Sequence, residues 1–165
     1  MNSITTLLAW LEASQLANAI RTSGYLFAII ESFHVIGLTM VFGTIAIIDF
    51  RLLGFASARR PFRRIASDVL KWTWAAFALS VMTGSLLFIS NAANYYHNNY
   101  FRLKMVLLAL SGLNMLIFEV TTAKSVHRWE NDPFAPVAGR AAAVVSLLLW
   151  TGIIFCGRWI GFTTL

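Results

Sequence analysis

The chain has 165 residues, of which 58% are hydrophobic and only 12% are charged. Ordinary soluble domains carry about 25% charged residues, so the composition excludes a soluble domain. The same numbers, with 14% aromatic residues, exclude intrinsic disorder. The formal net charge is +6, and the single cysteine excludes a disulfide scaffold or a cysteine-cluster metal site. The composition therefore predicts an integral membrane protein.

The first segment, residues 1–23, is too short and too polar to cross a bilayer. Its apolar side chains Ile4, Leu7, Leu8 and Leu11 recur at intervals of one turn, and polar residues lie off this stripe. A helix with one apolar stripe suits the membrane interface. We therefore predict an amphipathic interfacial helix on the outer surface in residues 1–23.

The rest of the chain, residues 24–165, contains four long apolar runs. About 20 apolar residues in a helix cross the hydrocarbon core, and continuous rather than alternating runs exclude a β-barrel. Short connections favour antiparallel neighbours. The sequence thus predicts an all-α fold, an integral membrane up-down-up-down four-helix bundle with an N-terminal interfacial helix. The predicted spans are about residues 24–50, 72–90, 101–122 and 141–162.

Basic residues are distributed unevenly between the two sides of the predicted bundle. Nine of the 13 Lys and Arg residues lie in the connections between spans one and two and between spans three and four. Because cytoplasmic loops are enriched in Lys and Arg, we expect these connections inside and both termini outside. The first connection contains a basic cluster, for which we expect anionic lipid head groups rather than nucleic acid as the partner. The cluster comprises Arg59, Arg60, Arg63 and Arg64.

Small residues at intervals of four let membrane helices approach closely. The first span has Thr39 and Gly43 at this spacing, and the second has Ala76, Ser80 and Gly84. We interpret both sets as packing surfaces.

The first span also carries a polar face. Six residues are separated by alternating steps of three and four, so they share one side of the helix, which we expect to point into the bundle. They are Glu31, His34, Leu38, Val41, Ile45 and Asp49. Charged groups inside a membrane are costly and mark functional sites by default. At the rise of an α-helix, Glu31 lies about 9 Å below Tyr25, and His34 lies about 13 Å below it.

Basic residues of the third and fourth spans lie at a matching depth. We expect Glu31 to form an ion cluster with Arg158 and Lys104, with His34 just beneath it. Two interpretations remain open. The cluster can fix the packing of the helices, with His34 bonded to a hydroxyl such as that of Ser85. Alternatively, these side chains form a pocket for a quinone head group, a cofactor propionate or a proton.

His34 is the only histidine inside a predicted span. A b-type cytochrome would need a second axial ligand facing it, and the available candidates are Met82, Met105 and Met115. A metal site at His34 is a weaker hypothesis, because no His-rich or Met-rich tract accompanies it. Haem b, a quinone and a metal ion therefore remain candidate ligands.

A set of characteristic strings runs through the chain. They are F-H-V-I-G at Phe33–Gly37, G-T-I-A-I-I-D-F-R-L-L-G at Gly43–Gly54, F-R-L-K-M from Phe101, G-L-N-M-L-I-F from Gly112 and G-R-W-I from Gly157. Together they resemble a family of small bacterial inner-membrane proteins of unknown function with four helices. The resemblance implies an inner-membrane location, so that the outward termini expected from the basic residues would be periplasmic, and an architecture like that of cytochrome b anchors and copper-resistance membrane proteins. In that family a histidine often follows G-L-N-M-L-I-F, whereas this chain has Glu119.

Three functions fit these features. The first is a non-catalytic membrane subunit that anchors or stabilises a larger complex, for example a redox complex, with other subunits or copies of itself as partners. The second is an electron-transfer protein that binds haem b or a quinone near Glu31, His34 and Arg158. The third is an oligomeric transporter or proton path. Without a nucleophile–base pair or phosphate loop in the sequence, we do not expect an enzyme.

Overall fold

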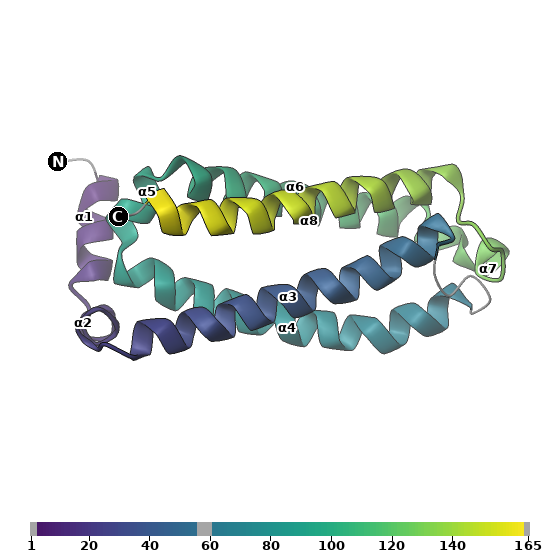
Figure 1. Ribbon diagram of the computed structural model, residues 1–165. Helices are drawn as coiled ribbons and strands as arrows, with labels where there is room; N and C mark the ends of the chain where they lie inside the picture. Colours follow the sequence, from purple (N-terminus) through teal and green to yellow (C-terminus); the bar gives the residue numbers. More distant parts are fainter. Residues whose placement is uncertain (1–2, 56–60, 164–165) are drawn as a thin grey trace.

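The computed structural model describes residues 3–55 and 61–163, and within these ranges it is helical without any strand (Figure 1). Four helices are long and apolar enough to cross a membrane, as the sequence predicts. They are α3 (Leu26–Leu53), α4 (Phe62–Ser90), α6 (Asn99–Thr121) and α8 (Val137–Thr163). The all-α class is therefore confirmed. Helix α4 begins well before the predicted residue 72, because the basic segment in front of the apolar run is also helical.

Short helices lie at both ends of the long ones. At one end, called here the α1 end, are α1 (Ser3–Glu12), α2 (Gln15–Thr22) and α5 (Ala92–His97). At the other, the α7 end, are a 3-10 turn, η1 (Ala123–Ser125), and α7 (Val126–Trp129). The carboxylate of Glu12 accepts a hydrogen bond of 2.8 Å from the backbone N–H of Ala93. This bond ties α1 to the first turn of α5, whose amides have no partner within the helix.

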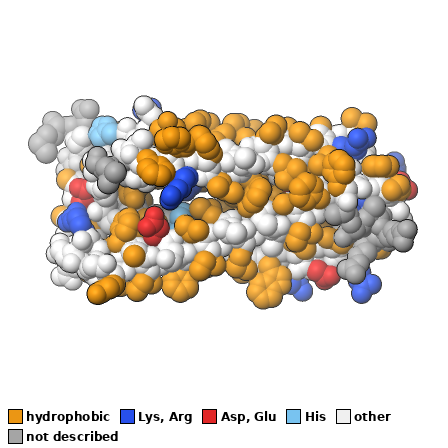
Figure 2. All heavy atoms as spheres, in the orientation of Figure 1, with side chains coloured by type: hydrophobic (Ala, Val, Ile, Leu, Met, Phe, Trp, Pro, Cys, Tyr) orange, Lys and Arg blue, Asp and Glu red, His pale blue; other side chains and the backbone are white. Residues whose placement is uncertain are grey.

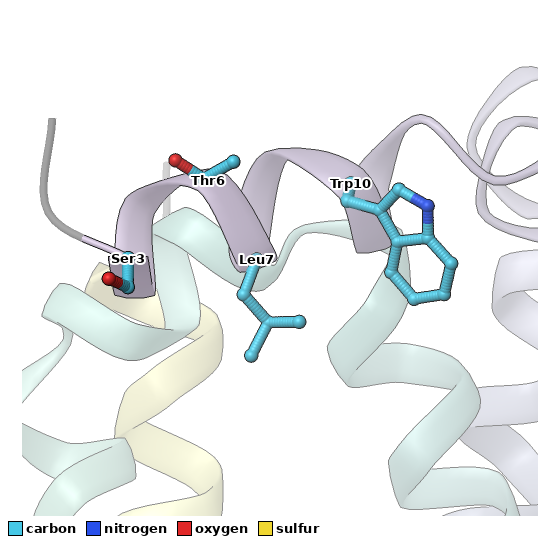
Figure 3. Close-up of a pocket in the computed structure, with 4 residues that line it drawn as sticks. All are labelled: Ser3, Thr6, Leu7 and Trp10. Atoms are coloured by element: carbon cyan, nitrogen blue, oxygen red, sulfur yellow. The ribbon is translucent and has the colours of Figure 1, made fainter.

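Helix α1 lies across the end of the long helices and buries only part of its apolar stripe. Leu8 is buried, whereas Ile4, Leu7 and Trp10 are exposed. Figure 3 shows Leu7 and Trp10 beside an open depression that Ser3 and Thr6 also line. Half of the predicted stripe therefore serves contact with the rest of the chain, and the other half faces outward, where an interfacial helix would meet lipid.

The long helices pack as two pairs. Helix α3 packs along α4, α6 packs along α8, and a contact between α3 and α8 joins the pairs. In the described part of the chain, α4 and α6 make no extensive contact, although only α5 separates them in sequence. Figure 1 shows α3 close to α8 near α7 and diverging from it toward α1 and α2. The two pairs are therefore closed at the α7 end and spread apart at the α1 end.

Two clusters of buried apolar side chains hold the pairs together. The cluster at the α7 end comprises Leu52, Phe62, Trp129, Ala135 and Ala143. The central cluster comprises Val41, Ala76, Trp150 and Ile153. In a bilayer, lipid would be as apolar as these side chains, so the helices would gain from close packing rather than from the hydrophobic effect.

Arg51 fastens the end of α3 at the α7 end. It is fully buried, and its Nη2 donates hydrogen bonds to the carbonyl oxygens of Glu130 and Asp132 at 3.0 and 3.1 Å. Gly54 ends the helix with a φ of 80°, a left-handed conformation that favours glycine. A Cβ at Gly54 would lie 2.5 Å from the ring of Phe134. The connection after α7 is therefore held directly against the end of α3.

The closest approach between helices lies at Gly37. A Cβ on Gly37 would lie 2.5 Å from the Ser80 Oγ and 3.3 Å from the carbonyl oxygen of Ala76. Ala76 and Ser80 are buried, as their predicted role in packing requires. The prediction for Thr39 and Gly43 was wrong, because both are exposed and no described atom lies within 4 Å of a Cβ on Gly43. Helix α3 therefore turns the face that carries Gly37 toward α4, and not the predicted face that carries Thr39 and Gly43.

This contact predicts different effects for two glycine substitutions in the same helix. Gly37→Ala should destabilise the protein by about 1–3 kcal/mol, because the added methyl has no room against Ser80. Gly43→Ala should leave stability unchanged or raise it slightly, because Ala is the better helix former. Thermal unfolding of the detergent-solubilised variants measures both. Equal effects at the two positions would contradict the packing of α3 on α4.

Candidate functional site

His34 lies where α3 meets α4. Its Nδ1 is 3.0 Å from the carbonyl oxygen of Ser80 and 3.1 Å from the Thr83 Oγ1. A carbonyl can only accept, so Nδ1 carries the hydrogen. The Thr83 hydroxyl donates its own hydrogen to the Leu79 carbonyl at 2.7 Å, which leaves its oxygen as a second acceptor for Nδ1. In the neutral ring Nε2 then keeps a free lone pair, able to accept a hydrogen bond or to bind a metal.

Gly84 leaves room for the imidazole. A Cβ at this position would lie 2.9 Å from Cε1 and 3.8 Å from Nε2 of His34. Sequence reasoning treats Ser80 and Gly84 as packing residues and misses that they also hold the ring. It also named Ser85 as the hydroxyl partner, whereas the Ser85 Oγ is directed to the Val81 carbonyl and Thr83 takes that role.

Lys104 reaches the same region from α6. Its side chain is only 9% exposed, and its Nζ lies 3.6 Å from the position of a Cβ on Gly157 of α8. The charge of Lys104 acts on the ring of His34. Among the described residues no carboxylate forms an ion pair with it. Burying an ammonium without a counter-charge costs free energy, and an electronegative partner would lower that cost.

Glu31 and Arg158 lie at the surface of this region. Both side chains are exposed, and the guanidinium of Arg158 lies over the ring of Phe162, 4.9 Å from its centroid. Within the described residues the structure does not bring Glu31 into an ion pair with Arg158 or Lys104. Figure 2 nevertheless shows acidic, basic and histidine side chains near one another on the face formed by α3 and α8. The predicted residues therefore share one neighbourhood without the predicted pairing.

An aromatic cluster closes the region toward the α1 end. The rings of Phe88 of α4 and Phe101 of α6 are stacked with centroids 5.4 Å apart, and Tyr95 of α5 packs against both. Phe88 lies one turn from Gly84, and Phe101 lies one turn from Lys104. The cluster therefore bridges α4 and α6 directly beyond the polar groups.

Tyr95 connects this aromatic cluster to Glu31. Burial raises the pKa of the Tyr95 hydroxyl, and the negative charge of Glu31 raises it further. Both effects disfavour the phenolate, so the ring remains neutral and can stay within the cluster. The sequence gives no indication that α5 folds back over the long helices, so Tyr95 is not among the predicted site residues.

The central apolar cluster closes the region on its other side. Val41 lies between His34 and Asp49 on the same face of α3, and it packs there with Trp150 and Ile153 of α8. Asp49 is buried in the other half of the structure, with the Ser146 hydroxyl within hydrogen-bonding reach. The predicted inward face is therefore correct from His34 to Asp49, whereas Glu31 is exposed because α3 diverges from α8 there.

The candidate metal and haem ligands can also be placed. Met82, Met105 and Met115 are 66%, 41% and 47% exposed, so none is buried beside His34 as an axial ligand. No group of three His, Cys, Asp or Glu side chains that could hold a metal ion occurs among the described residues. His34 therefore offers a single nitrogen, and Lys104 offers the nearby positive charge.

These features define a helical protein with four helices long enough to cross a membrane and a polar site near His34. The chain belongs to the family of unknown function DUF6644, whose model matches residues 7–163. No curated protein and no solved structure matches the chain. Membership agrees with the resemblance to a family of unknown function.

The hydrogen bonds of His34 predict its tautomer. Long-range proton–nitrogen correlation spectra of ¹⁵N-histidine-labelled protein should show the Nδ1–H form for His34, because Ser80 offers only an acceptor. The variant His34→Gln assigns the signal, and the exposed His97 and His127 serve as internal references. An Nε2–H tautomer at His34 would contradict the free lone pair described above.

Proposed function

We propose that the protein is a membrane electron-transfer subunit that binds a quinone or haem b at His34 within a larger complex. The observation that carries the proposal is the orientation of the imidazole, whose Nδ1 is fixed by Ser80 and whose Nε2 remains free. The second ring nitrogen is therefore available to a ligand. Lys104 adds a donor for an oxygen atom of the ligand, which would also compensate its buried charge.

A purified sample tests this proposal. Protein from native membranes should contain a quinone on solvent extraction, or a Soret band that shifts on reduction. His34→Leu should lower ligand occupancy about two- to tenfold, since a hydrogen bond between neutral groups is worth about 0.5–1.5 kcal/mol. His97→Leu, at an exposed position of α5, serves as the matched control.

Two results would contradict the proposal. If folded protein neither carries nor takes up a quinone or haem, the electron-transfer proposal is refuted. A change of ligand content in His97→Leu equal to that in His34→Leu would refute the assignment of the site.

A non-catalytic anchoring subunit is the second candidate. The bond from Nδ1 joins α3 to α4, and this alone could explain why His34 is present. The apolar side chains of α6, among them Leu103, Val106 and Leu110, are exposed and offer a surface to lipid, to other membrane subunits or to a second copy. A transporter or proton path would require a route past Val41, Trp150 and Ile153, so the geometry favours the first two functions.

We further propose that the long helices form an up-down-up-down bundle in the bacterial inner membrane, with the α7 end in the cytoplasm and both termini in the periplasm. Arg63 and Arg64 at the start of α4 are exposed at that end and would meet anionic lipid head groups. Arg59 and Arg60, which belong to the same basic cluster, lie outside the described residues. The excess of basic residues at the α7 end supports this orientation.

Cysteine labelling tests the orientation. In a Cys156→Ala background, a membrane-impermeant maleimide applied to cells with a permeabilised outer membrane should label Asn94→Cys and leave Arg64→Cys unlabelled. Both positions are exposed, so accessibility in the folded protein is matched. Labelling of Arg64→Cys in intact inner membranes, with Asn94→Cys protected, would reverse the topology.

A further inference from the structure

We propose that the ligand of the His34 site is a lipid-soluble quinone that enters sideways from the bilayer between α3 and α8, with Lys104 donating a hydrogen bond to one of its carbonyl oxygens. This inference rests on the proposed function, because it names the ligand and its route into the same site.

The chemistry of the two polar groups selects the ligand. Lys104 can only donate, and the free Nε2 of His34 can accept, so together they match the carbonyl of a quinone and the hydroxyl of its reduced form. Haem b would need a second axial ligand, whereas the three candidate methionines are exposed. Glycines lie beside both polar groups, Gly84 at the imidazole and Gly157 at the ammonium. At Gly84 the imidazole itself occupies the space that a side chain would take, and at Gly157 no side chain separates α8 from the ammonium.

Three sides of the site are closed by contacts in the structure. The stacked rings of Phe88 and Phe101 cover it toward the α1 end. The cluster of Val41, Trp150 and Ile153 covers it toward the α7 end. The packing of α3 along α4 covers it on the side where Nδ1 is bonded.

The fourth side, between α3 and α8, is not closed in this way. These helices meet through the central cluster and diverge toward the α1 end (Figure 1). Figure 2 shows polar side chains of all three types exposed on this face, although apolar side chains surround them. Glu31 on α3 and Arg158 on α8 are both exposed there, at the level at which a head group would pass from the interface. A hydrophobic tail could remain in the lipid while the head group reaches Lys104.

The binding groups are tested first, with decylubiquinone and purified protein in lipid nanodiscs. Lys104→Met should weaken binding about tenfold, because the bond to the carbonyl oxygen is lost. The same substitution removes a buried charge, so the folded protein should be at least as stable. Exposed Lys124→Met on η1 is the matched control. Unchanged affinity in Lys104→Met would overturn the role of Lys104.

The route is tested by closing it. In a Cys156→Ala background, Glu31→Cys and Arg158→Cys are joined by a short bis-maleimide before the quinone is added. Association of decylubiquinone should then slow at least tenfold, and cross-linking after loading should slow release to a similar degree. The control is the same reagent on Met82→Cys of α4 and Leu103→Cys of α6, two exposed positions on helices that make no extensive contact with each other in the described structure.

The possible results distinguish the ligand, its route and the proposed function from one another. If the unmodified protein binds haem but no quinone, the quinone is refuted while the proposed electron-transfer function stands. If the unmodified protein binds decylubiquinone and the α3–α8 cross-link changes neither rate, the lateral route is refuted while the site stands. Slowing by the α4 and α6 modifications alone would place the route between those helices and overturn the proposal.

Discussion

Helices in a bilayer gain little by hiding apolar surface from one another, so their association depends on how closely their backbones approach. In this protein the close approach of α3 to α4 determines the other contacts between the long helices. Gly37 places its backbone against Ser80 and Ala76 of α4, and Val41, one turn further on, packs with Trp150 and Ile153 of α8. Because α3 contacts both α4 and α8, it joins the pair α3–α4 to the pair α6–α8, which would otherwise share few contacts.

The same approach creates the polar site. With α3 this close to α4, the imidazole of His34 reaches the Ser80 carbonyl and lies against Gly84. The ring is thereby held at Nδ1, and its other nitrogen keeps a free lone pair. Lys104 then comes from α6 with its charge inside the protein and without a carboxylate beside it in the described structure. A buried charge of this kind is difficult to explain by packing alone, since an apolar residue would serve better.

The two ends of the molecule differ in how firmly they are held. At the α7 end, Arg51 is bonded to two carbonyl groups of the following connection, and aromatic side chains fill the space between helices. At the α1 end, α3 and α8 diverge, and short helices together with the cluster of Phe88, Tyr95 and Phe101 cover the opening. The α7 end is therefore fixed by hydrogen bonds and packed side chains, whereas α3 and α8 separate from each other toward the α1 end.

The sequence by itself determined the all-α class, the four helices long and apolar enough to cross a membrane and the inward side of α3 from His34 to Asp49. Apolar run length and helical periodicity carry this information, since both are properties of one helix at a time. The tertiary structure alone decided which residues meet across helices. Depth in the membrane can be counted along the chain, but the rotation of each helix about its axis depends on its neighbours. For this reason Arg158 and Lys104 match Glu31 in depth without pairing with it, Gly37 rather than Gly43 forms the contact, and Thr83 rather than Ser85 bonds His34.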